Sequence, residues 1–145
     1  MKILAVLVLG VILLFNPLAE SDKNNDNIRE IRQNRYLEHY EECKTVNAAL
    51  KDIDFDVAWC EKDKFTFRNS DIVIDSPVKK FHKICKAVYK DKYGNLFFRL
   101  GGSFDDEWGI VIVNNPEKIN FDGYPTSVKL LDDCYYFSSY SGDWR

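Results

Sequence analysis

The sequence is poor in the residue types that most often carry catalysis and metal binding. It has two histidines, one methionine and four cysteines in 145 residues. The cysteines are 17, 25 and 49 residues apart, with no C-x-x-C pair, and these spacings do not fit a structural zinc site. Neither a G-x-S-x-G nucleophile elbow nor a glycine-rich phosphate loop is present. We therefore expect no metal, no cofactor and no enzymatic activity.

An excess of positive charge is also lacking. The formal net charge is −3, whereas nucleic-acid binders usually concentrate positive charge to displace counterions from phosphate. The chain is 46% hydrophobic and 14% aromatic, which excludes a disordered polypeptide. These values predict a globular protein that does not bind nucleic acid.

The longest apolar run is at the N-terminus and is too short to span a membrane. It extends from Ile3 to Phe15 after Lys2 and ends at Asn16-Pro17, short of the ~20 apolar residues that a membrane-spanning helix needs. Such a run is typical of a secretory signal peptide. Small residues at Ala19 and Ser21 predict cleavage before Asp22, with a cut after Ala19 or an uncleaved anchor as alternatives. The prediction is a signal peptide at 1–21 and one domain at 22–145, secreted or periplasmic, that meets a membrane only during export or through an uncleaved leader.

All four cysteines lie in the predicted exported part. An even number of cysteines in an oxidising compartment is typical of disulfide bonds. Three pairings are compatible with the sequence, and the candidates are Cys43, Cys60, Cys85 and Cys134.

Hydrophobic periodicity predicts an α+β fold, with a long N-terminal helix and a short second helix packed on a mostly antiparallel β-sheet. A capping box at Asn27 and Glu30 indicates a helix that continues to Leu50. Alternating residues predict a strand over 52–60, and further strands are expected at 64–68, 71–75, 87–89, 96–100, 108–113, 128–131 and 134–140. Ser76-Pro77 and apolar residues at helical spacing predict the second helix, which extends to Val88.

Acidic and aromatic residues near two predicted strands are the candidate partner-binding residues. The loop after Gly101-Gly102 carries three consecutive acids and a tryptophan, and an aromatic-rich segment ends the chain. Exposed Tyr and Trp residues are frequent anchors in protein interfaces. The candidates are Asp105, Asp106, Glu107, Trp108, Tyr140 and Trp144.

The leading prediction is a non-catalytic exported protein that binds another protein, such as an inhibitor or an immunity-type protein. Six lysines between Lys79 and Lys92, against an acid-rich interval from Gly102 to Asp133, predict charge polarity that would orient a charged partner. One alternative is an exported hydrolase that pairs an acid of residues 105–107 with Asp132 or Asp133. The other is an envelope-associated structural protein that keeps its leader.

Overall fold

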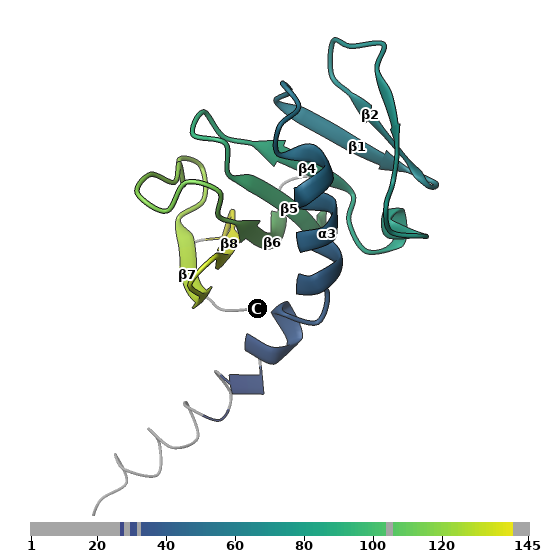
Figure 1. Cartoon of the computed structure of the whole chain (residues 1–145). Helices are drawn as coiled ribbons and strands as arrows, with labels where there is room; N and C mark the ends of the chain where they lie inside the picture. Colours follow the sequence, from purple (N-terminus) through teal and green to yellow (C-terminus); the bar gives the residue numbers. More distant parts are fainter. Residues whose placement is uncertain (1–26, 28–29, 32, 104–105, 141–145) are drawn as a thin grey trace, which may run out of the picture. The chain divides into compact units, whose positions relative to one another are not determined.

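A computed structural model of the chain describes residues 27, 30, 31, 33–103 and 106–140. The compact unit Tyr36–Arg145 contains helix α3 (Tyr40–Leu50) and every labelled strand (Figure 1). The segment Met1–Arg35 forms a separate unit, of which residues 27, 30, 31 and 33–35 are described and helical. The predicted leader lies outside the described residues, so its cleavage and the boundary after Ser21 stay predictions. No helix among the described residues is long and apolar enough to cross a membrane.

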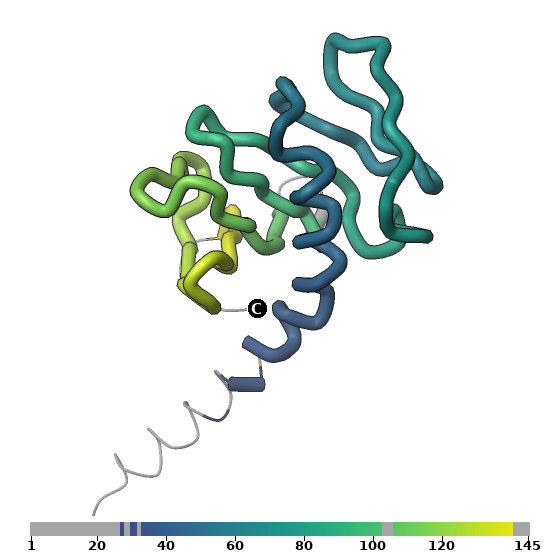
Figure 2. Tube along the Cα trace, viewed as in Figure 1, coloured from purple at the N-terminus to yellow at the C-terminus, as the bar shows by residue number. Residues whose placement is uncertain are grey.

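Eight antiparallel strands form one sheet. Figure 2 traces the path of the chain through it. Their order is β3-β2-β1-β4-β5-β6-β8-β7, so β3 and β7 are the two edge strands. The strands are β1 (Val57–Glu61), β2 (Lys64–Phe67), β3 (Val73–Asp75), β4 (Ala87–Lys90), β5 (Leu96–Ser103), β6 (Asp106–Ile112), β7 (Thr126–Leu131) and β8 (Cys134–Ser138).

The expected long N-terminal helix is wrong. Residues 33–36 are helical, residues 37–39 form a turn, and α3 begins at Tyr40. The amide of Tyr40 donates to the carbonyl of Leu37 at 3.1 Å, a tightened turn that interrupts the regular helical pattern. The buried Tyr36 ring stacks on Tyr136, with ring centroids 4.2 Å apart, before the interruption. The helix is therefore interrupted at residues 37–39 rather than continuous to Leu50.

The expected second helix is also wrong. The only regular helical structure between β3 and β4 is a short 3₁₀ helix, η1 (Phe81–Lys83). Lys80 precedes it with a φ of 56°, a left-handed conformation that an α-helix cannot contain. Ala87–Lys90 forms β4, where a strand was expected over 87–89, and it pairs with both β1 and β5. Because these residues belong to the sheet interior, the remaining segment is too short to sustain an α-helix on its own.

The strand expected over 52–60 begins only at Val57. The preceding Asp56 side chain accepts a hydrogen bond from the Val57 amide at 2.7 Å and forms an ion pair with Arg68. Alternation then places Ala58 in the buried core, whereas Trp59 is exposed. The aspartate-rich segment is thus a turn after α3 and not one wet face of a strand.

The strand register separates two faces of the sheet. We call the side that packs on α3 the helix face and the opposite side the outer face. One row of directly paired residues on the helix face is Ala58, Val88, Phe98, Ile110, Tyr136 and Val128. The adjacent row, on the outer face, is Trp59, Ala87, Arg99, Gly109, Phe137 and Ser127.

The helix face carries the main hydrophobic core. From α3, Cys43, Val46 and Leu50 are fully buried in it. Phe81 of η1 extends the cover over β1 and β2, where its ring lies 6.0 Å from that of Phe65. Lys90 closes the end of the helix, since its Nζ donates to the carbonyls of residues 51 and 53 at 2.7 and 2.6 Å. A cation at a helix C-terminus also interacts favourably with the helix dipole.

The outer face has a smaller core that covers only part of the sheet. Phe97, Val111 and Phe137 are buried there. The segment between β6 and β7 covers them with Ile119, Phe121 and Tyr124, and the rings of Phe97 and Tyr124 stack at 5.6 Å. This cover lies on β5, β6 and β8. The outer face of β1, β2 and β3 receives no residue of that cluster.

We predict that Gly101→Ala destabilises the domain by about 1–3 kcal/mol, the usual cost of overpacking. A Cβ at Gly101 would lie 2.6 Å from the indole ring of Trp108, which packs in turn on Tyr36 and Tyr136. Urea unfolding followed by circular dichroism measures the change. Trp108→Phe removes the atoms nearest to Gly101, so the double variant should lose less stability than the sum of the single variants. Strictly additive effects would show that the two residues do not interact.

Candidate binding surface

An exposed apolar patch lies on the outer face at the β3 end of the sheet. Trp59 pairs with Thr66, and Thr66 pairs with Val73, so these three residues form one continuous row across β1, β2 and β3. Trp59 is 41% exposed, Val73 is 54% exposed and the adjoining Ile72 is 56% exposed. We call this row of Trp59, Thr66 and Val73 the corner surface; the exposed Ile72 precedes β3 and is not part of the row. Exposed apolar residues scattered singly are ordinary, whereas neighbouring ones mark interaction sites.

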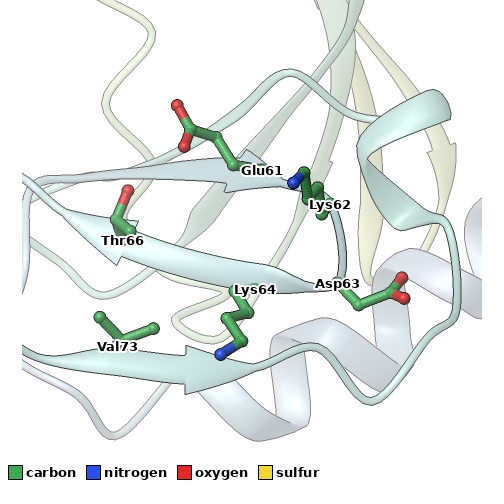
Figure 3. Close-up of a pocket in the computed structure, with 6 residues that line it drawn as sticks. All are labelled: Glu61, Lys62, Asp63, Lys64, Thr66 and Val73. Carbon is green, nitrogen blue, oxygen red and sulfur yellow. The ribbon is translucent and has the colours of Figure 1, made fainter.

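A charged row borders the corner surface. Glu61 pairs with Lys64, and Lys64 pairs with Asp75. These residues lie two positions along their strands from the corner surface, and therefore on the same outer face. A hollow of about 620 Å³ opens here, and Figure 3 shows that its walls come from the β1–β2 hairpin and from β3. Its lining residues are Glu61, Lys62, Asp63, Lys64, Thr66 and Val73. An apolar centre with charges of both signs at its border is the arrangement of a protein interface.

The β3 strand is an edge of the sheet. It is three residues long and pairs on one side with β2 only. An edge strand presents backbone N–H and C=O groups to which another extended chain can add. The corner surface therefore offers backbone groups at its border as well as apolar side chains.

A partly buried carboxylate organises the other end of the outer face. Glu107 accepts hydrogen bonds from Tyr124 at 2.9 Å and from Tyr89 at 3.1 Å, and Arg99 lies 3.7 Å away. Tyr124 belongs to the segment that covers the outer core, so this cluster fastens the cover to β4 and β6. Burial, and next the hydrogen bond to Glu107, raise the pKa of Tyr124 well above its ordinary value of 10.0. We assign the cluster a structural role, because each of its contacts is internal to the sheet and its cover.

Among the predicted partner-binding residues that the structure describes, Glu107 and Trp108 lie on opposite faces of the sheet. Glu107 lies in the outer-face cluster, whereas the neighbouring Trp108 packs on the helix face against Tyr36 and Tyr136. Asp106 begins β6 opposite Ser103, and Tyr140 is exposed beyond the end of β8. Asp105 and Trp144 lie outside the described residues. The role of these residues in binding stays a prediction.

The acids expected for a hydrolase lie apart. Asp133 accepts hydrogen bonds from the Tyr40 hydroxyl at 2.6 and 2.8 Å and pairs with Lys44 at 3.0 Å, all on the helix face. Glu107 is on the outer face, and the Asp132 side chain is fully exposed and pairs with Lys129. Of the described acids, Glu107, Asp132 and Asp133 therefore do not come together across a cleft.

The cysteines gather in the protein interior. Cys43, Cys85 and Cys134 are fully buried, Cys60 is partly buried, and the structure holds all four as free thiols. Burial raises the pKa of Cys134 to about 12. Within the described part of the chain, no three histidine, cysteine or acidic residues are grouped so as to hold a metal ion.

Comparison of the chain with protein-family models, with curated proteins and with solved structures finds no match. Sequence reasoning missed the corner surface. Its only signal was the apolar triplet Ile72-Val73-Ile74 beside Asp71 and Asp75, which indicates a strand but not the face that stays exposed.

We predict that the domain loses stability as the pH rises above about 10, and that Tyr124→Phe makes this loss shallower. The raised pKa means that folded Tyr124 keeps its proton where an unfolded tyrosine has lost it. Its stabilising contribution is complete below the unfolded pKa and disappears as the pH rises through the folded pKa. Urea unfolding at a series of pH values tests this.

Tyr135→Phe is the matched control, since Tyr135 lies on the same face but outside the Glu107 cluster. Identical pH dependence in the Tyr124→Phe and Tyr135→Phe variants would contradict the assignment of a structural hydrogen bond to Tyr124.

Proposed function

We propose that this chain is an exported, non-catalytic protein-binding domain that engages another protein through the corner surface. An inhibitor or an immunity-type protein is the most concrete form of this proposal. The observation that carries it is the exposed row of Trp59, Thr66 and Val73 beside an edge strand. The apolar leader and the even number of cysteines support the exported location.

The chemistry of the corner surface favours a protein partner. A partly exposed tryptophan supplies a large apolar area that a partner can bury, and tryptophan is enriched among the residues that dominate binding energy. The bordering Glu61, Lys64 and Asp75 give charges of both signs that fix orientation rather than affinity. The backbone of β3 adds hydrogen-bond donors and acceptors for an extended segment of the partner.

The two alternative functions have less support. A hydrolase needs two carboxylates that face each other across the substrate, and Glu107 and Asp133 lie on opposite faces of the sheet. An envelope-associated structural protein would keep its apolar leader, which the mass of the mature chain tests directly.

We predict that a photoreactive amino acid at position 66 captures one protein in the cells that export this chain. Thr66 lies at the centre of the corner surface, so a bound partner would lie within reach of the reactive group. Cross-linking followed by denaturing electrophoresis and mass spectrometry should give a discrete adduct that contains a single partner. The adduct should fall at least severalfold when Trp59→Ala or Val73→Ser is added.

Two controls accompany this experiment. The same photoreactive residue at position 129, on the edge strand β7, should give no discrete adduct. Val73→Ser should leave stability within about 0.5 kcal/mol, as is usual for exposed side chains. Equal adducts at positions 66 and 129, or adducts that persist without Trp59, would refute binding at the corner surface.

We predict that the chain isolated from the exported fraction lacks residues 1–21. Intact mass measurement should give a protein that starts at Asp22, or at Glu20 if the peptidase cuts after Ala19. A full-length chain in the membrane fraction would support the envelope-associated alternative. A full-length chain in the cytosol would contradict export.

A further inference from the structure

We propose that the four cysteines form two specific disulfide bonds, Cys60 with Cys85 and Cys43 with Cys134. The inference rests on the exported location in the proposed function, because an oxidising compartment is where such bonds persist. The sequence alone leaves three pairings open, and the arrangement of the strands selects one.

All four thiols belong to one core on the helix face. Cys43 is on α3, Cys60 is on β1, Cys85 directly precedes β4, and Cys134 begins β8. Three of them are buried members of the main core, and Cys60 packs against it. Segments distant in the sequence thus present their sulfur atoms to the same apolar interior.

Cys60 and Cys85 are neighbours at the start of β4. The Cys60 amide donates to the carbonyl of Lys86 at 3.4 Å, which places β1 beside the residue that follows Cys85. Ala58 and Phe67 pair on the helix face. Alternate residues of a strand share a face, so the Cys60 side chain also points to the helix face. The Cys85 thiol donates to the Ala87 carbonyl at 3.2 Å and also interacts with the thiol of Cys60.

The segments that carry Cys43 and Cys134 are fastened to each other by residues beside the two cysteines. Tyr40 and Lys44, on either side of Cys43, both bind Asp133, the residue before Cys134. Burial opposes ionisation of Asp133, but hydrogen bonds from Tyr40 and Lys44 lower its pKa overall. Burial raises the pKa of the Cys43 thiol, and among neighbouring charges Cys134 adds more to this shift than Glu42 or Cys60.

The strand order excludes both other pairings. One requires Cys60 with Cys134, and β1 is separated from β8 by four strand spacings, roughly 19 Å along the sheet. The other requires Cys85 with Cys134, and β4 is three spacings from β8, roughly 14 Å. A disulfide joins Cα atoms about 4.4–6.8 Å apart. The proposed pairing is the one that avoids both long distances.

Each bond forms by thiol–disulfide exchange with a small or protein disulfide such as glutathione disulfide. Two cysteine thiols lose two protons and two electrons, one S–S bond forms, and the oxidant is reduced to two thiols. A thiolate is the attacking species, and burial in the folded domain disfavours it for Cys43, Cys85 and Cys134. Both bonds should therefore form while the chain folds, before the core closes.

Peptide mapping tests the pairing, because trypsin places each cysteine in a separate peptide. These peptides are residues 36–44, 52–62, 84–86 and 130–145. The full chain is unfolded, reduced, refolded with glutathione disulfide and glutathione, alkylated, and digested without reduction. The expected products are one linked pair of 52–62 with 84–86 and one linked pair of 36–44 with 130–145. Any other linked pair as the main product, or four alkylated cysteines, would overturn the proposal.

The same mapping on protein isolated from the exporting cells separates this proposal from export itself. Four free thiols in that material, with the expected two bonds after refolding, would refute the oxidising location but leave the pairing intact. Replacing Cys43 and Cys134 together by alanine should keep the 60–85 bond and lower Tm by roughly 10 °C. Loss of the 60–85 bond in that variant would contradict two independent pairs.

Discussion

The sheet is wider than the helix that packs on it, and the rest of the architecture depends on this difference. Other segments must cover the strands that the helix does not reach. Eight strands extend over roughly 34 Å, whereas an 11-residue helix is only about 17 Å long. The helix face is completed by η1, whose Phe81 covers β1 and β2. The outer face is completed over β5, β6 and β8 by the segment before β7. The corner surface is the part of the outer face that this described cover does not reach.

Hydrogen bonds and ion pairs from polar side chains hold the covering segments in position on the sheet, because apolar packing alone is not directional. Lys90 binds the carbonyls of residues 51 and 53 just after α3, and Asp133 binds Tyr40 and Lys44 near its start. Asn47 and Asn114 exchange two side-chain hydrogen bonds at 3.0 and 2.8 Å between the helix and the end of β6. On the opposite face Glu107 holds Tyr124. These contacts determine which residues of the sheet are left for a partner.

Local patterns predicted the strands better than the helices. Strands expected at 64–68 and 108–113 correspond to β2 and β6, because short apolar runs bounded by turn residues need little tertiary information. The helix predicted over 76–88 does not form, because the residues at its C-terminal end belong to β4, which pairs with β1 and β5. Hydrophobic periodicity indicates that a segment is amphipathic. It does not indicate which strand, distant in the sequence, will form hydrogen bonds with the backbone of that segment.

The candidate site was less predictable than the fold. Alternation shows that Val57 and Trp59 share a face, but only the register of β1, β2 and β3 places Trp59 beside Thr66 and Val73. Likewise, the composition of residues 105–108 drew attention to Glu107 and Trp108, and strand geometry separated them onto opposite faces. The cysteines were predicted to pair, but the choice of partners needed the strand order.

Hydroxyl-radical footprinting of the chain, in the exported fraction and again after purification, tests the central claim most directly. If the corner surface binds a protein partner, Trp59 and Val73 should oxidise more slowly in the exported fraction than after purification. Tyr140, exposed near the other edge of the sheet, should oxidise equally in both samples. Unchanged oxidation of Trp59 and Val73, or protection of Tyr140 alone, would contradict the account.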